Sequence, residues 1–283
     1  MSKEIPILFN RDMIQAILKR LKSVTRRVIN PQPIDNREID GNFFEGNHKG
    51  YVKVDGHPGW QDQFVKEFSK WQPGDILWAR ETYTTLEPEH CEGYVKRFAY
   101  KADIKDRDSE IIRKEYIECG YPYQWKPSIH MKKDAARIWL LNKTVTIERV
   151  ADITDAGAIE EGVLSLTSNF IEKNFPLYNS KMEERIRSMN LTEAPPIGPS
   201  PREKFKALWQ SINGKPKPIQ HKKNGKMVTT GYIVYPFDEQ CGKEWETYNG
   251  KYKGLPLQVI CNPWVFVIGF EVLSTTGKPD NLN

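Results

Sequence analysis

The sequence predicts an α+β protein, built as a small β-barrel with flanking helices and several insertions. Short apolar segments separated by Gly, Pro and Asn turn signals are typical of β-rich folds. The C-terminal segment 262–272 is almost continuously apolar, which indicates a strand buried on both faces. Few segments have helical periodicity. We expect one domain over residues 1–283, with insertions at 34–65, 102–130, 166–200 and 215–260.

The first elements are predicted to be a strand, a helix and a basic turn. Residues 5–9 form a short apolar run, and Asn10 can accept a hydrogen bond from a free backbone N–H of the next helix. Apolar residues then recur at helical spacing from Met13 to Leu21. We expect the helix to end near Lys22, because β-branched residues and prolines follow. The basic residues around this turn, with no acid among them, are Lys19, Arg20, Lys22, Arg26 and Arg27.

The middle of the chain predicts further strands and one short helix. Residues 71–75 contain Pro-Gly and predict a turn, followed by a strand over 76–83. Another strand is expected at 94–101, and one or two more within 136–150, where apolar residues alternate. Residues 152–162 indicate a short helix, with Gly162 as the residue that ends it.

The C-terminal third predicts one helix and two hairpins. Ser200 and Glu203 form a capping box with proline between them, and the stripe of Phe205 and Trp209 after it indicates core packing. Gly214 is expected to end this helix. Asn-Gly pairs at 224–225 and 249–250 are hairpin signals.

Composition limits the class of protein. Hydrophobic residues make up 39% and charged residues 28% of 283 residues, enough for a packed core. The N-terminus lacks the apolar run of a secretory signal, and no run of about 18 apolar residues suggests a membrane span. We therefore expect a cytoplasmic protein with no membrane partner. The four cysteines form no CxxC pair, so free thiols and no metal site are expected, and no cofactor is indicated.

The net charge of +5 is unevenly distributed. A second acid-free cluster follows the predicted C-terminal helix and consists of Lys215, Lys217, Lys222, Lys223 and Lys226. Clusters of this kind attract phosphate backbones. The alternative is a solvated face with no partner.

The order of these elements and four motifs resemble the ASCH family of the PUA-like superfamily. The motifs are AILKRLKSVTRR (16–27), QPGDIL (72–77), DITDAGAIEEG (152–162) and VFVIGFE (265–271). A further set is similar to large ASCH-like proteins common in bacteriophages, which would place the protein in a host cytoplasm: PILF (6–9), TRR (25–27), RET (80–82), WKPSIHM (125–131), LWQSIN (208–213) and NPW (262–264). The resemblance covers about half of the chain. One departure is Arg20, where many relatives have glycine.

The resemblance implies a cleft that accepts a base, a nucleoside, a nucleotide or a nucleic-acid end. Small bacterial members hydrolyse N4-acetylcytidine, and their lysine, threonine and glutamate match Lys22, Thr25 and Glu161. Amide cleavage needs a nucleophile and a proton acceptor. Thr25 would attack the acetyl carbon, Lys22 would take the proton, and Glu161 would hold Lys22 or the leaving amine. As alternatives, Lys22 would neutralise a helix end and Glu161 would be a solvated residue.

Further residues are predicted to contact the ligand, because they combine charge, hydroxyl groups and aromatic surface. They are Arg26, Arg27, Arg80, Glu81, Trp125, Lys126, Ser128 and His130. As alternatives, Arg80 and Glu81 form an internal ion pair and His130 is structural. Three functions stay open: a hydrolase of a modified nucleoside or nucleotide, a non-catalytic binder of RNA, modified DNA or a signalling nucleotide, and a metal-independent ribonuclease using Lys22 with His130. The sequence does not set the oligomeric state.

Overall fold

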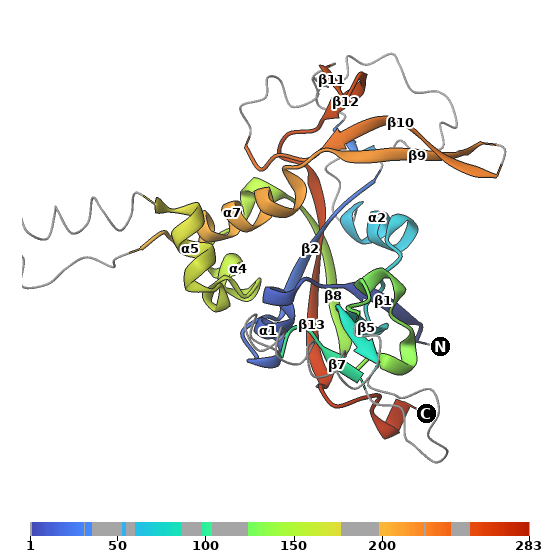
Figure 1. Cartoon of the computed structure of the whole chain (residues 1–283), viewed down its shortest axis with the longest axis vertical. Helices are drawn as coiled ribbons and strands as arrows, with labels where there is room; N and C mark the ends of the chain where they lie inside the picture. The colour runs from blue at the N-terminus through green and yellow to red at the C-terminus, as the bar shows by residue number, and fades with distance from the viewer. Residues whose placement is uncertain are drawn as a thin grey trace, which may run out of the picture.

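The computed structural model describes residues 2–30, 32–35, 53–54, 60–85, 98–103, 124–176, 198–223, 225–238 and 250–282. Its centre is a five-stranded sheet in the order β1-β5-β8-β13-β2 (Figure 1). These strands are β1 (Glu4–Leu8), β2 (Val24–Val28), β5 (Ile76–Arg80), β8 (Trp139–Arg149) and β13 (Trp264–Ser274). β1 and β5 are parallel, and the other neighbours are antiparallel. The α+β class is confirmed.

The five-stranded sheet is open, because β1 and β2 are its edges. No sheet among the described strands closes into the barrel that the sequence predicts. The two edges are nevertheless linked by a side chain, since Nη2 of Arg27 in β2 donates to the carbonyl of Leu8 in β1. The main core lies on the face that also carries helix α1 (Arg11–Leu18), with Ile17, Leu140 and Ile268 fully buried. The sheet is therefore curled around α1. Its edge strands are joined by one side-chain hydrogen bond, whereas the edge strands of a closed barrel are joined by a row of backbone hydrogen bonds.

Helix α1 begins as predicted and ends one turn early. Oδ1 of Asn10 accepts from the N–H of Met13 at 2.9 Å. The last helical residue is Leu18, rather than one near Lys22, and Arg20 adopts a left-handed φ of 59°. Nη1 of Arg20 donates to the Val272 carbonyl at 3.0 Å. The turn thus has the backbone that glycine favours, with an arginine in its place.

Helices cover the other face of the sheet (Figure 1). α4 (Asp155–Glu160) is shorter than predicted and contacts α7 (Pro201–Asn213). Both hydrogen bonds of the predicted capping box between Ser200 and Glu203 are formed at the start of α7. A second core of buried residues lies beneath them and includes Val163, Phe205 and Val265. Of the predicted insertion at 166–200, the structure describes α5 (Ser168–Asn174), while 177–197 lie outside the described residues.

Gly162, directly after Glu161, is required by the close approach of α4 to α1. Its φ is +87°, a conformation that residues with a Cβ rarely adopt. A Cβ there would lie 2.7 Å from Cβ of Ala16 and 3.0 Å from Cβ of Lys22. The absence of a side chain lets Glu161 sit directly against Lys22.

A second sheet stands at one end of the first, in the order β11-β12-β10-β9 (Figure 1). Its strands are β9 (Lys217–Lys223), β10 (Lys226–Val234), β11 (Gly250–Tyr252) and β12 (Leu255–Val259). The predicted hairpin at Gly225 is confirmed, since β9 and β10 pair on either side of it. The predicted hairpin at 249–250 is wrong in position. Gly250 begins β11, and the turn is made by Lys253 and Gly254, whose φ values of 52° and 78° fit a tight hairpin turn.

Other predicted elements are shifted. The strand expected over 76–83 ends at Arg80, and β6 (Tyr83–Thr85) pairs with β7 (Phe98–Tyr100) in a separate small sheet. The region 34–65 was predicted as an irregular insertion, yet it contains β3 (Ile34–Asp35), β4 (Lys53–Val54) and the start of α2 (Trp60–Phe68). The 3-10 turns are η2 (Ser128–His130), η3 (Lys133–Ala135), η4 (Val150–Asp152), η5 (Val163–Ser165) and η6 (Asp280–Leu282).

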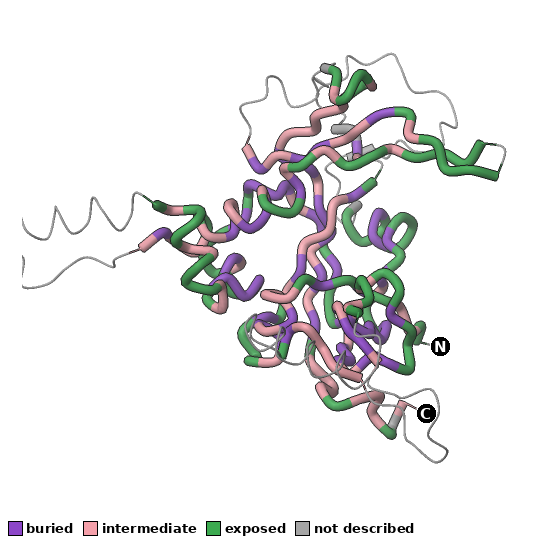
Figure 2. Tube along the Cα trace, viewed as in Figure 1, coloured by how far each residue is buried: buried purple, intermediate pink, exposed green. Residues whose placement is uncertain are grey.

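Three further findings concern the described residues. Cys261 is disulfide-bonded, contrary to the expectation of free thiols, and its partner lies outside the described residues. Within the described ranges, no helix has the length and apolar character needed to cross a membrane. Figure 2 shows the buried residues concentrated along the five-stranded sheet and its helices, while the outer half of the β9–β10 hairpin is exposed.

Candidate functional site

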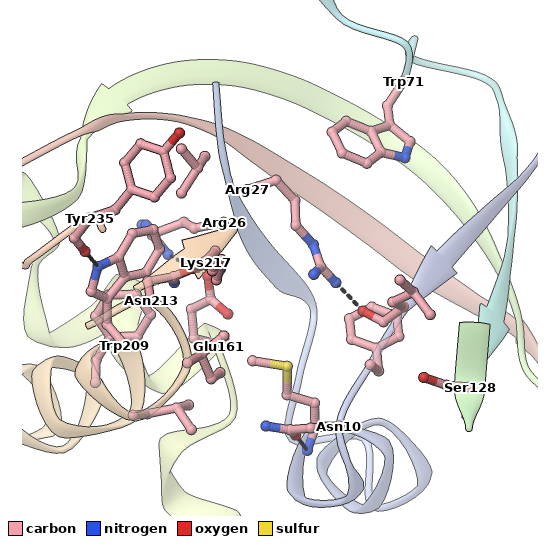
Figure 3. Close-up of a pocket in the computed structure, with 17 residues that line it drawn as sticks. Asn10, Arg26, Arg27, Trp71, Ser128, Glu161, Trp209, Asn213, Lys217 and Tyr235 are labelled. Atoms are coloured by element: carbon pink, nitrogen blue, oxygen red, sulfur yellow. Dashed lines mark hydrogen bonds and ion pairs between the residues drawn. The ribbon is translucent and has the colours of Figure 1, made fainter. Parts of the chain in front are cut away.

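A cleft of about 450 Å³ opens at the edge strand β2 (Figure 3). β2, the start of α1, α7 and the base of β9 all contribute side chains to its wall. The aromatic residues of the wall are Phe9, Trp71, Phe205, Trp209 and Tyr235, and the charged ones are Arg26, Arg27, Glu161 and Lys217. The cleft therefore combines aromatic surface with more positive than negative charge.

Arg27 is the central cation of the cleft. Its Nη2 donates to the Leu8 carbonyl, and its Cζ lies 5.2 Å from the centre of the Phe9 ring. Its Nε is buried and has no hydrogen-bond partner in the described part of the protein, and the same is true of Nε1 of Trp71. Burial lowers the pKa of Arg27 to about 10, which leaves the guanidinium protonated at neutral pH. Two residues of one cleft thus retain unused donors.

Two lysines add to this positive charge. Nζ of Lys217, the first residue of β9, donates to Oδ1 of Asn213 at 2.8 Å. Lys70 lies with its Nζ 4.4 Å from the centre of the Trp71 ring. Both lysines are exposed, and Lys70 is not among the residues of the wall. Partial desolvation lowers the pKa of both, and the charge of Arg27 lowers it further. Mutual repulsion of this kind is relieved by an anion between the cations.

Glu161 in the cleft wall and Lys22 behind it form a buried ion pair. Nζ of Lys22 is 2.5 Å from Oε2 of Glu161, and the side chains are 0% and 1% exposed. The same Nζ donates to the carbonyls of Val24 at 2.7 Å and Glu161 at 2.9 Å. All three donors of the ammonium are therefore used. Burial lowers the pKa of Lys22, and the charge of Glu161 opposes that shift.

The second oxygen of Glu161 is bound by Arg26. Nη1 of Arg26 lies 3.3 Å from Oε1 of Glu161, and its Nε lies 2.6 Å from Oε1 of Glu148. The Arg26 side chain is only 5% exposed. Arg26 thus lines the cleft with charge that two carboxylates already balance, which distinguishes it from Arg27.

The three residues predicted to hydrolyse an amide do not meet at the cleft. Glu161 lines the wall, whereas neither Lys22 nor Thr25 is among the residues of the wall. Thr25 is 1% exposed and pairs with Ile268. Side chains alternate between the two faces of a strand, so Thr25 is on the same face of β2 as Arg27. Arg26, which binds Glu161, is on the opposite face. Only the Lys22–Glu161 half of the predicted relay is formed.

Neither Arg80 nor Glu81 is among the residues of the cleft wall, although Arg80 pairs in register with Leu8, which is. Nε of Arg80 donates to the Met131 carbonyl at 3.0 Å. Glu81 is buried and accepts two bonds from Arg137, at 2.9 and 3.0 Å, rather than pairing with Arg80. Burial raises the pKa of Glu81 despite the bonds from Arg137. The structure therefore places Glu81 in an internal ion pair.

The predicted segment 125–130 reaches the cleft at one residue. Ser128, in η2, lines the wall (Figure 3). Lys126 is exposed and forms a backbone bridge with Tyr83, and the carbonyl of exposed His130 accepts from the Tyr83 hydroxyl at 3.3 Å. Trp125 is half-buried and is not among the residues of the wall. Of this segment, only Ser128 joins Arg26, Arg27 and Glu161 at one site.

Several residues of the cleft were missed as site residues. From the sequence, Trp71 indicates only the start of a turn, and Trp209 indicates only core packing. Nε1 of Trp209 donates to the Tyr235 carbonyl at 2.8 Å, and the residue is buried, yet it also lines the cleft. Lys217 belongs to the second basic cluster, so the sequence indicates that it could contact an anion. Nothing in the sequence indicates that it lines the same cleft as Arg27.

Comparisons with protein-family models, with curated proteins and with solved structures found no match for this chain. Within the described residues, no group of three His, Cys, Asp or Glu side chains could hold a metal ion. The fold and the cleft thus define an α+β protein with a cationic, aromatic cleft at the edge of its central sheet.

Proposed function

We propose that the cleft binds an aromatic anion, namely a nucleotide or a nucleotide unit of a nucleic acid. The observation that carries the proposal is that Arg27 and Lys217 line one cleft together with Trp71, Trp209 and Tyr235. A planar guanidinium suits phosphate oxygens, and aromatic side chains stack on bases. A cavity of about 450 Å³ lies within the usual range for small-molecule sites.

The electrostatics favour an anion over a neutral nucleoside. Arg27, Lys217 and Lys70 each have a pKa lowered by burial, and Lys217 and Lys70 are further affected by Arg27. A phosphate near these cations would offset this repulsion. Glu161 does not cancel this charge, because Lys22 and Arg26 already bind its two oxygens.

The geometry supports binding more than hydrolysis. The ammonium of Lys22 donates to three acceptors, and it would have to give up one of these protons before the neutral amine could act as a base. His130, the partner proposed for a ribonuclease, is exposed and outside the cleft wall. The curled sheet around α1 and the basic turn after it support a relationship to PUA-like ASCH folds, which is part of the same proposal.

A thermal-shift panel tests the proposed function. The panel contains nucleosides, nucleoside mono-, di- and triphosphates, and N4-acetylcytidine. We expect nucleotides to raise the melting temperature, because a ligand at 100 times its Kd adds about 2.7 kcal/mol. Arg27→Gln should weaken binding by roughly 10- to 100-fold, the value of one or two hydrogen bonds to a charged group. Mass spectrometry of the same mixtures would detect turnover.

Arg80→Gln is the matched control. It is the same substitution, but Arg80 belongs to β5, the strand next to β1, and is not among the residues of the cleft wall. Its ligand-induced shift should equal that of the wild type. Comparing ligand-induced shifts removes any difference in the stability of the unliganded variants. A panel without any shift, or an equal loss in both variants, would contradict the proposal. Conversion of N4-acetylcytidine by the wild type would instead support the hypothesis that the protein is a hydrolase.

A further inference from the structure

The β9–β10 hairpin projects from the body of the protein (Figure 1), and its first residue, Lys217, lines the cleft. All of its residues from Gln220 to Lys223 and from Lys226 to Val228 are exposed (Figure 2). Met227 is 61% and Val228 40% exposed. Between Glu203 and Asp238 the sequence contains lysines but neither Asp nor Glu. The hairpin is therefore a positively charged arm with no acidic residue of its own.

One face of this arm leads directly from the cleft to the tip. Lys217 lines the cleft as the first residue of β9. Because side chains alternate along a strand, Lys217, His221 and Lys223 lie on the same face of β9, and Lys222 lies on the other. Lys226 is paired directly with Lys223 and so shares its face. Six residues of strand span about 20 Å, or roughly six base-pair steps of a duplex.

The pairing of Lys223 with Lys226 is unfavourable in the isolated protein. Like charges directly opposite each other destabilise an antiparallel pair. A tight hairpin end that places two lysines side by side is stabilised when a polyanion lies across them. A single mononucleotide in the cleft cannot reach them, whereas a chain of phosphates can.

We propose that the nucleotide in the cleft belongs to a nucleic-acid chain, and that the face of the arm formed by Lys217, Lys223 and Lys226 binds its flanking phosphates. This inference rests on the proposed function and extends it. The arm contributes affinity without reading bases, because lysine contacts to phosphate position a nucleic acid and carry no sequence information.

The test compares a mononucleotide with oligonucleotides of 4 and 12 nucleotides, single-stranded and duplex, by fluorescence anisotropy and calorimetry at several salt concentrations. The arm variant is Lys223→Gln with Lys226→Gln. We expect unchanged affinity for the mononucleotide and roughly 10- to 50-fold weaker binding of the 12-mer near 0.1 M salt. The slope of log K against log salt should fall by about 1.5, since each phosphate contact contributes about 0.7 to 0.9.

Two controls isolate the face of the arm. Lys143→Gln with Lys173→Gln removes the same charge from exposed positions elsewhere, and Lys222→Gln removes a lysine from the opposite face of the same strand. Both should bind the 12-mer nearly as the wild type does. All these positions are exposed, so the variants are expected to fold.

The outcomes separate the two proposals. If the wild type binds mononucleotides but the arm variant binds the 12-mer with unchanged affinity and salt slope, the arm inference fails and the proposed function stands. The inference also fails if Lys222→Gln weakens the 12-mer as much as the arm variant does. If neither a mononucleotide nor an oligonucleotide binds the wild type at any salt concentration, the proposed function itself fails.

Discussion

Breaking the Lys22–Glu161 pair gives a test of whether Lys22 is a structural or a chemical residue. Removing one partner of a buried ion pair typically costs about 3–5 kcal/mol, because the other charge stays buried without compensation. Lys22→Met leaves Glu161 with Arg26 as a partner at 3.3 Å, so we expect a loss near the lower value. Glu161→Leu leaves Lys22 with only the carbonyls of Val24 and residue 161, so its loss should be near the upper value.

The assay is urea denaturation of both single variants and of the double variant. The double variant should lose about 1–3 kcal/mol less than the sum of the singles, since the two groups are in direct contact. Lys143→Met is the matched control, because Lys143 pairs with Glu271 at 3.5 Å on the surface, and such a pair contributes less than about 1 kcal/mol. Equal m-values would show that the denatured states are comparable.

Two results would refute this reasoning. One is additivity of the two substitutions to within about 0.5 kcal/mol, which would mean that the ion pair is not formed. The other is a Lys22→Met variant more stable than the wild type. Residues that lower stability are retained mainly where activity requires them, so that result would favour a catalytic role for Lys22.

Two further predictions concern stability. Gly162→Ala should lower the free energy of unfolding by more than about 2 kcal/mol, since it adds left-handed backbone strain to an overlap with Ala16 and Lys22; a loss below about 1 kcal/mol in urea denaturation would contradict it. Burial raises the pKa of Tyr235 to about 12, above its usual value of 10.0. The unfolded chain therefore loses this proton first, and stability should fall as pH rises from 10 to 12. Phenolate absorbance follows the titration, and Tyr235→Phe should make the fall shallower.

Local signals predicted the elements better than the closure of the sheet. The Asn10 cap, the capping box at Ser200 and the hairpin at Gly225 depend on neighbours in the chain, so the sequence contains them directly. Whether a sheet closes depends on how its two edges meet, and here the contact is the bond from Arg27 to Leu8. No local pattern encodes that contact.

The candidate site was predicted in part for the same reason. Arg26, Arg27 and Glu161 belong to motifs near the helix-to-strand turn, and they do line the cleft. Trp71 and Lys217 come from distant parts of the chain. Trp71 follows α2 and packs edge-on against Phe266 of β13, whereas Lys217 begins β9 and is held by Asn213 of α7. Helix α2 was missed because the residues around its start are rich in polar and turn-forming types, which hid its few apolar positions Phe64 and Val65.

The bond between Arg27 and the Leu8 carbonyl has an entropic consequence for any ligand of the cleft. A free surface arginine loses about 2 kcal/mol of rotamer entropy when a ligand fixes it. Arg27 is already fixed by Leu8 and by the ring of Phe9, while its Nε is still unused. The cost of ordering this side chain is therefore met during folding, and more of each contact with a ligand appears as affinity.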